Sequence, residues 1–297
     1  MPTIGVVHSV HLSNRFKANF TQALAHSGWS AGTYNVVWPA HDNDGHYGRK
    51  ANGTPDNSLE TVVTSYVNQN VNLIVAAGGL VSALAAYKVI HPLANRTPVV
   101  ALVGRQPVQG ETGHTELGDT TVFPHGGIVY LDVNTGCVAR RDALVAAFPG
   151  QVSNATIGLM VNANSSMSDG EINSWHTGGQ NIVLKFPDLA NNARDNNFAH
   201  FGPFFTAAKT QNPGLTGIVV SADPYFYTYR TQLMTADQVL KISFPITNYA
   251  YKDDGSPIHA WNPNLHTISG AVDMLSKYYA LGAAAGAVLS ASRIDRK

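Results

Sequence analysis

The chain has 297 residues, of which 44% are hydrophobic and 13% are charged, and its formal net charge at pH 7 is zero. This length accommodates one large core or two ordinary ones, since domains commonly run to roughly 100–200 residues. The neutral charge balance argues against nucleic acid and anionic membranes as partners, because both attract proteins with an excess of Lys and Arg. We therefore expect a globular chain with two lobes.

Cysteine and histidine usage predicts neither a metal nor a cofactor. The single cysteine, Cys137, excludes an internal disulfide and any paired-cysteine zinc or redox site, so we expect a small buried residue. There are twelve histidines, but the nearest pair, His8 and His11, lacks the spacing of a zinc-binding helix.

The ends of the chain bear on its location. Residues 1–3 lead directly into an apolar run, without the basic and then apolar leader that marks export. We expect a cytoplasmic protein, or a periplasmic or extracellular one whose leader has been replaced by Met1. The longest apolar segment, 268–291, contains Asp273 and Lys277, which predicts a packed helix and no membrane insertion.

The first part of the chain alternates apolar runs with helical patterns. Strands are predicted at 4–7, 34–38, 73–76 and 98–103. Phe16, Phe20, Ala23 and Leu24 recur at helical spacing after the first strand, and Gly28 stands where that helix would stop. Because apolar and polar residues alternate little within these strands, we expect parallel sheets covered by helices on both faces.

The second part repeats this pattern. Strands are predicted at 157–162, 181–186, 217–221 and 243–247, with helices near 198–210 and 225–240. Ser168 and Glu171 have the spacing of a capping box for the helix between the first two of these strands. Residues 106–127 and 252–263 lose periodicity, so we place the crossings between lobes there. The predicted fold is α/β, with two Rossmann-like lobes of parallel sheet joined by a hinge: residues 1–108 plus 255–297, and residues 109–254.

Both lobes open with the same short motif. An apolar run beginning Ile-Gly ends in small polar residues at 4–9 and again at 157–166. Each copy is typical of the first βα unit of a parallel layer. Ligands of open α/β sheets bind beyond the carboxyl ends of the strands, so two facing lobes would surround one cleft. The repeat therefore predicts ligand capture.

The residues that follow the predicted strands are the candidate ligand-binding residues. They carry hydroxyls, amides, rings and glycines that expose backbone N–H groups. From the residues alone the set is His8, Ser9, Gly78, Gly79, Arg105, Asn162, Ser165, Ser166, Asp223, Tyr225 and Tyr249.

Several of these residue types have a second interpretation. Short polar residues such as Ser9, Asn162 and Ser166 also terminate strands and cap helices. Arg105 suits a ligand carboxylate, and equally a surface or inter-lobe ion pair. Asp223 suits a ligand ammonium or a sugar hydroxyl, and equally a helix N-cap.

The aromatic run at 225–229 has more ring surface than one helix face buries, which predicts that part of it, Tyr225 in particular, faces the cleft.

Nucleotide and serine-hydrolase motifs are absent from the sequence. Gly78 and Gly79 lack the Gly-x-Gly-x-x-Gly spacing of a dinucleotide site, and no Gly-Lys-Ser/Thr phosphate loop or Gly-x-Ser-x-Gly elbow occurs. An acid–base pair of His8 and Asp223 across the cleft remains an alternative.

The order of these motifs carries a resemblance: Ile4-Gly5-Val6-Val7, Leu73 to Gly78, Pro98-Val99-Val100, Asn134-Thr135-Gly136, Ile157 to Ser165, and Ser221-Ala222-Asp223-Pro224. The chain resembles the substrate-binding proteins of ABC transporters, in the group related to tryptophan and tyrosine uptake components, which have the type I periplasmic-binding fold. The resemblance implies reversible binding of a small molecule between hinged lobes, no cofactor, and an ABC permease as partner. It also implies cleft positions for Ser9, Gly78, Asn134, Asn162, Ser165, Ser166, Asp223 and Tyr249.

Two functions follow from the sequence. The first is the binding of an amino acid or aromatic acid, as a transport substrate-binding protein or a sensor. The alternative is a cofactor-independent lyase, isomerase or hydrolase that uses His8 and Asp223.

Overall fold

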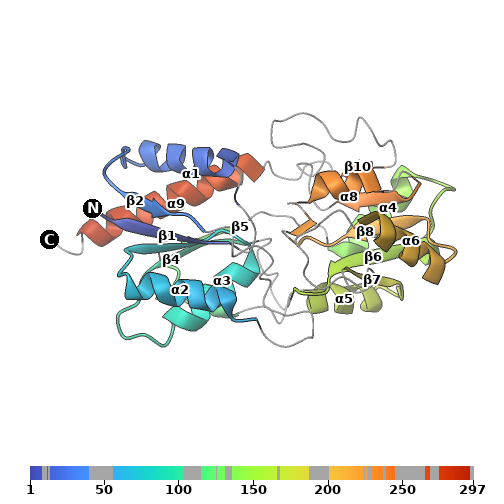
Figure 1. Ribbon diagram of the computed structural model, residues 1–297, viewed down its shortest axis with the longest axis horizontal. Coiled ribbons are helices and arrows are strands. Elements are labelled where there is room, and N and C mark those ends of the chain that lie inside the picture. The colour runs from blue at the N-terminus through green and yellow to red at the C-terminus, as the bar shows by residue number, and fades with distance from the viewer. Residues whose placement is uncertain are drawn as a thin grey trace. The chain divides into compact units, whose positions relative to one another are not determined.

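The structure is a computed structural model that describes residues 1–8, 12, 14–39, 56–103, 115–124, 126–130, 136–165, 168–186, 201–223, 225–226, 229–236, 239–244, 265–267 and 274–294. Its strands form two five-stranded sheets, and all of the strand pairs are parallel (Figure 1). The predicted fold class, two Rossmann-like lobes with parallel sheets, is confirmed.

The chain divides into two compact units. The first comprises Met1–Gly48, Pro55–Asp132 and Asp273–Lys297, and the second comprises Arg49–Thr54 and Val133–Val272. The sequence placed the changes of lobe after residues 108 and 254, whereas the units change at about 132 and 272. The first unit runs past residue 108 because it includes one more strand, β5, than the sequence pattern shows.

The first unit consists of β1 (Thr3–Val7), α1 (Asn14–His26), β2 (Asn35–Val37), α2 (Ser58–Asn68), β3 (Leu73–Ala76), α3 (Leu80–Ile90), β4 (Val99–Val103), the 3-10 turn η2 (Thr115–Gly118), β5 (Ile128–Tyr130) and α9 (Met274–Ile294). The strand order is β2-β1-β3-β4-β5. Helix α1 packs with α9, and α2 packs with α3, on opposite faces of the sheet (Figure 1). The predicted apolar face of α1 is buried, and Gly28 ends the helix at a φ of 86°.

The second unit consists of α4 (Cys137–Ala147), the 3-10 turn η3 (Asn154–Thr156), β6 (Ile157–Asn162), α5 (Ser168–Thr177), β7 (Val183–Phe186), α6 (Phe201–Gln211), β8 (Gly217–Val220), α8 (Arg230–Ala236), β9 (Lys241–Phe244) and β10 (Leu265–Thr267). The strand order is β10-β9-β8-β6-β7. Helix α4 packs with α5, and α6 packs with α8. Strand β10 is absent from the sequence prediction.

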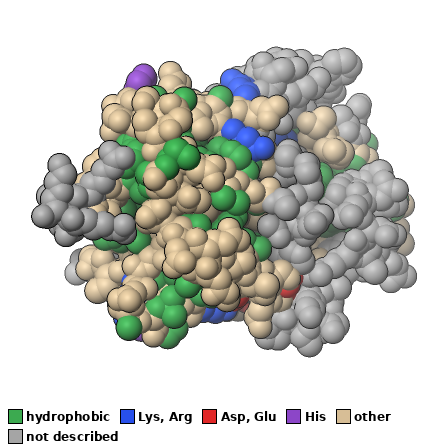
Figure 2. All heavy atoms as spheres, turned by 60° about the vertical axis from the view of Figure 1, so that its left-hand side comes forward, with side chains coloured by type: hydrophobic (Ala, Val, Ile, Leu, Met, Phe, Trp, Pro, Cys, Tyr) green, Lys and Arg blue, Asp and Glu red, His purple; other side chains and the backbone are tan. Residues whose placement is uncertain are grey.

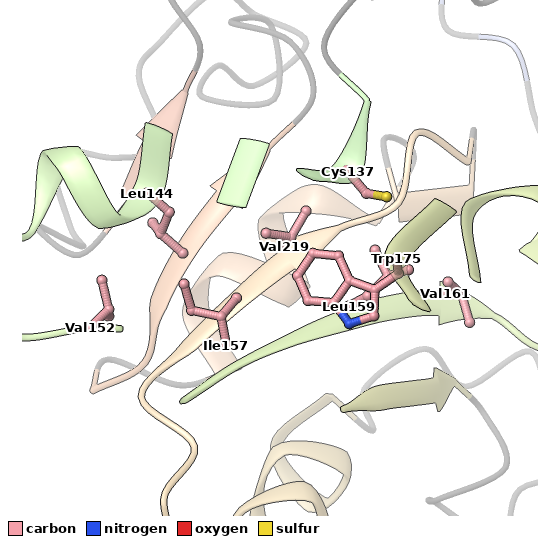
Figure 3. Packing of buried hydrophobic residues seen from close by; sticks show 8 residues of the cluster. All are labelled: Cys137, Leu144, Val152, Ile157, Leu159, Val161, Trp175 and Val219. Atoms are coloured by element: carbon pink, nitrogen blue, oxygen red, sulfur yellow. The ribbon is translucent and has the colours of Figure 1, made fainter. Parts of the chain in front are cut away.

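One core cluster of the second unit joins α4 and α5 to the sheet (Figure 3). Trp175 of α5 is its largest side chain, and its indole N–H donates to the Ile182 carbonyl over 3.0 Å. Cys137 lies in the same cluster at 1% exposure, which confirms the expected small buried residue. The cluster packs α4 and the last turn of α5 against the middle strands, β6 and β8.

The glycine of the repeated Ile-Gly motif is required by close packing in both units. A Cβ at Gly5 would lie 2.5 Å from the ring of Tyr66, and a Cβ at Gly158 would lie 3.0 Å from Ile182 and Leu184. The two glycines therefore let a neighbouring side chain lie directly against β1 in the first unit and β6 in the second.

The Tyr66 hydroxyl is expected to contribute measurably to stability. It is buried and donates to the Val6 carbonyl over 3.0 Å. Tyr66→Phe leaves that acceptor without its donor, and we expect the free energy of unfolding to fall by about 1 kcal/mol in urea titrations. Tyr34→Phe, at a partly exposed tyrosine of the same unit, serves as the control. Equal losses for the two variants would contradict this role.

The α1–α9 contact depends on small residues of α9. A Cβ at Gly282 would clash with the carbonyl oxygen of Phe20 and lie 2.9 Å from the Cβ of Ala23. A Cβ at Gly286 would lie 2.5 Å from the Cβ of Ser27. The two helices thus approach closely because these positions carry no side chain.

Helix α9 confirms the helix predicted in the apolar segment 268–291. None of the helices in the described ranges has the length and apolarity that a membrane crossing requires. On the described part of the face in Figure 2, Lys and Arg side chains lie in small separate groups among other atoms, in keeping with the zero net charge.

Candidate functional site

Each sheet has a point where the direction of winding reverses, and candidate residues follow the strands on both sides of it. In the first sheet this point lies between β1 and β3, and in the second it lies between β6 and β8. At such a switch point the two strands connect to helices on opposite faces, which leaves a crevice at their carboxyl ends where α/β proteins bind ligands.

The switch point of the first unit offers hydrogen-bond donors. His8 follows β1 and is buried, while Gly78 and Gly79 follow β3 and lead into α3. Gly79 is the N-cap of α3 at a φ of 76°, so the N-cap residue has no side chain with which to cap this end. The first N–H groups of α3 therefore suit an anionic group, which the positive end of the helix dipole favours.

Ser82 adds a hydroxyl to the first turn of α3. Its Oγ is fully buried and makes no hydrogen bond to any part of the chain that the structure describes. A buried hydroxyl without a partner carries a desolvation cost, and a bound polar group relieves such a cost.

The switch point of the second unit is organised around Asp223. This residue follows β8, and its Oδ1 accepts a hydrogen bond from the Tyr225 backbone N–H over 2.8 Å. The Asn162 side chain, at the end of β6, donates to the same oxygen over 3.4 Å. The Ser165 hydroxyl also hydrogen-bonds to the carboxylate. Asp223 thus links the loops that follow β6 and β8, and it also accepts the backbone N–H of Tyr225, two residues further along the chain.

The loop after β6 is held by its own polar contacts. The Asn162 Oδ1 accepts from the Asn164 N–H over 3.0 Å, and the Ser168 hydroxyl donates to the Asn162 carbonyl over 2.6 Å. Ser168 therefore helps to fix the loop, and the Glu171 carboxylate, the other member of the predicted capping box, pairs with Arg140. The Asn164 Oδ1 is buried and has no hydrogen-bond partner among the described residues, so a ligand donor group would satisfy it.

Burial dominates the electrostatics of Asp223. Desolvation raises the pKa of this carboxyl to about 6, against the lowering effect of the hydrogen bonds from Tyr225, Ser165 and Asn162. The Glu171 carboxylate raises it further by like-charge repulsion. A positively charged ligand group would offset both costs.

Tyr225 belongs to an aromatic cluster of the second unit. It is 7% exposed, and its ring centroid lies 5.6 Å from Phe186 and 4.8 Å from Tyr229. Burial, with the neighbouring Tyr229 and Asp223, raises the pKa of the Tyr225 hydroxyl. The Tyr225 ring therefore packs against Phe186 and Tyr229 next to Asp223.

The candidate residues divide by unit. His8, Gly78 and Gly79 share the switch point of the first unit, and Asn162, Ser165, Asp223 and Tyr225 share that of the second. The alternative acid–base pair joins His8 and Asp223, which belong to different sheets. The predicted positions Ser9, Arg105, Asn134, Ser166 and Tyr249 lie outside the described residues.

The sequence analysis missed Ser82 and Asn164 as residues of the two switch points, and it missed the effect of Glu171 on Asp223. The unpartnered Ser82 and Asn164 oxygens have no sequence signal, because burial without a partner depends on the whole fold. Within the described ranges, no group of three or more His, Cys, Asp or Glu residues is placed to hold a metal ion.

Comparison with solved protein structures identifies the fold. The chain has the type I periplasmic-binding fold of ABC transporter solute-binding proteins, as the resemblance implied. No protein-family model matches the sequence, and no curated protein sequence matches it significantly.

The chain is similar to an ABC domain from Streptococcus pneumoniae solved in complex with L-Trp, with a TM-score of 0.61 and 14% identity over 98% of this chain and 84% of that one. It is also similar to a glucose-galactose binding protein from Geobacillus stearothermophilus, with a TM-score of 0.56 and 9% identity over 97% and 90% of the two chains. A solute-binding protein from Burkholderia graminis in complex with D-arabinose has a TM-score of 0.55 and 11% identity, over 98% and 88%.

Proposed function

We propose that the chain reversibly binds a small polar ligand, an amino acid or an aromatic acid, through the switch points of both sheets. The observation that carries the proposal is the pairing at the second switch point, where Asn162 and Asp223 meet across the ends of β6 and β8. Solved structures of the same fold hold L-Trp or sugars, which supports a small polar ligand.

The chemistry of the two switch points favours an amino acid within this class. The first offers the N-terminus of α3 and the Ser82 hydroxyl, which suit a carboxylate. The second offers the Asp223 carboxylate and the Asn164 Oδ1, which accept hydrogen bonds from an ammonium. In this proposal the protein serves as a transport substrate-binding protein or sensor, and a permease is its partner in transport.

A thermal-shift screen of amino acids, aromatic acids and monosaccharides tests the proposal. A ligand present at about 100 times its Kd stabilises a protein by about 2.7 kcal/mol, so we expect a hit to raise Tm by several degrees. A complete absence of hits in all three classes would contradict the proposed binding function. Mass spectrometry of the incubated hit separates binding from turnover, since the enzyme alternative requires a product.

A further inference from the structure

The two units correspond strand by strand around their switch points. Read from the edge strand next to the first strand of each unit, the orders β2-β1-β3-β4-β5 and β7-β6-β8-β9-β10 are the same. When the Ile-Gly motifs of β1 and β6 are aligned, the partner of the isoleucine across the switch point is Leu73 in the first unit and Gly217 in the second. Gly79 and Asp223 each follow that partner by six residues. These two residues therefore occupy equivalent positions, where the chain leaves a central strand.

The second unit places a carboxylate at this position. The Asp223 Oδ1 accepts the backbone N–H of Tyr225 over 2.8 Å, and Tyr225 is helical. The backbone of the two units is alike here, because the Asp223 carbonyl accepts from the Phe226 N–H over 3.1 Å and the Gly79 carbonyl accepts from the Ala83 N–H over 3.1 Å. The carboxylate thus lies at the start of a helix, where N–H groups lack an acceptor within the helix and the dipole favours a negative charge.

The first unit has no side chain at the equivalent position. Gly79 has a φ of 76° and a ψ of −161°, a combination that is essentially restricted to glycine, so an aspartate could not stand there without strain. The backbone N–H groups of Leu80, Val81 and Ser82 begin α3 and have no acceptor within it. Helix α3 therefore begins with hydrogen-bond donors where the second unit supplies a carboxylate of its own.

The Ser82 hydroxyl points to a ligand independently. It is fully buried and has no hydrogen-bond partner in the part of the chain that the structure describes. In other helices Ser174, Ser290 and Ser292 each donate to the carbonyl four residues earlier, over 2.8 to 3.0 Å. Because the Cα–Cβ bond of a helical residue tilts toward the helix N-terminus, the Ser82 side chain leans toward the first N–H groups of α3. An anionic oxygen at this end of the helix would accept from both kinds of donor.

We propose that a carboxylate of the ligand takes the place at α3 that the Asp223 carboxylate takes in the second unit, and that Ser82 is the residue that binds it. A neutral group at this place could accept the hydroxyl bond, but the helix dipole and the charge-assisted bonds would not favour it. The inference rests on the proposed function and narrows its ligand class to carboxylates, so that neutral sugars and carboxamides are excluded.

Three probe pairs that differ by a carboxylate test the selection. The pairs are L-tryptophan with L-tryptophanamide, indole-3-propionate with indole-3-propionamide, and D-glucuronate with D-glucose, titrated calorimetrically at pH 7. In each pair that binds, we expect the carboxylate to bind about tenfold more tightly or better, as for hydrogen bonds to a charged group. We expect Ser82→Ala to reduce the affinity for the carboxylate by about tenfold and to reduce the preference with it. A neutral member that binds as tightly as its carboxylate counterpart would overturn the proposal.

The matched control is Ser243→Ala. The Ser243 hydroxyl is likewise fully buried and without a partner among the described residues, but it lies inside β9 and not at the start of a helix. We expect both variants to be at least as stable as the natural protein in urea titrations, because neither loses a hydrogen bond. Only Ser82→Ala should lose affinity for the carboxylate. A less stable Ser82→Ala, or equal binding in the two variants, would assign Ser82 a structural role and overturn the inference.

A further measurement uses acetate, the carboxylate group alone. Acetate titrated into nitrogen-15-labelled protein should shift the amide signals of Val81 and Ser82, and neutral acetamide should not. An absence of acetate shifts overturns the inference, even if a compound of the thermal-shift screen binds and the proposed function stands. Acetate shifts at these amides in a protein that binds nothing in that screen would support the carboxylate site and contradict the proposed function.

Discussion

Replacing Asp223 with asparagine is expected to weaken ligand binding and, above pH 6, to stabilise the protein. Asparagine retains an oxygen that can accept the Tyr225 N–H bond, but it has no charge to bury. The loss of one charged hydrogen bond, about 1.5–3 kcal/mol, corresponds to a decrease in affinity of about tenfold to 100-fold.

The stability change follows from the sign of the pKa shift. The pKa of Asp223 is about 6 in the folded protein and near 3.8 in the unfolded chain, so the folded state holds the extra proton between these values. The free energy of unfolding therefore falls as pH rises from about 4 to 6 and stays lower above it, by about 2–3 kcal/mol at most. Asp223→Asn removes this dependence.

Urea unfolding of both proteins at pH 4, 6 and 8 checks the prediction. The stability difference should be small at pH 4 and should favour Asp223→Asn at pH 8. Asp169→Asn, at an exposed carboxylate of α5, is the control and should not reproduce this profile. A variant that is less stable than the natural protein at pH 8 would show that Asp223 is mainly a structural cap.

Replacing Gly282 with leucine is expected to cause the largest loss of stability in the first unit. Even a single Cβ at this position meets the Phe20 carbonyl and the Ala23 Cβ, so a leucine must push α9 away from α1. The added side chain should lower the free energy of unfolding by about 3 kcal/mol or more, although glycine has the poorer helix propensity by about 1 kcal/mol.

The matched control is Ala287→Leu, which enlarges an exposed position of the same helix. We expect this variant to unfold within about 0.5 kcal/mol of the natural protein in urea titrations, because surface substitutions usually have small effects. Similar losses for the two variants would mean that the close approach of α1 and α9 does not depend on Gly282.

The positions of the central strands and of the candidate residues after them were predictable for a physical reason. Buried parallel strands such as β3 and β6 are continuous apolar runs, and the polar residue after each run marks its carboxyl end. Asn162 and Asp223 are 61 residues apart, yet the rule that ligands bind at strand ends placed them together.

Other features leave no local pattern. Strands β5 and β10 have three residues each and lie at sheet edges, too short for a periodic signal. The Arg140–Glu171 pair joins two helices across 31 residues, and neither residue stands out within its own helix. Glu171 had the spacing of a capping box, but tertiary packing gave its carboxylate a buried arginine partner instead.

The contact of α9 with α1 has a consequence for the order in which the protein is synthesised. Helix α9 also contacts β3, β4 and β5, but it follows the whole second unit in the chain. A ribosome that makes about 5–20 residues per second therefore synthesises residues 133–272 before α9, which packs on one face of the first sheet. During that interval the second unit can fold. The surfaces of α1, β3, β4 and β5 that α9 later covers, including Phe16 and Phe20 of α1, stay exposed and accessible to chaperones.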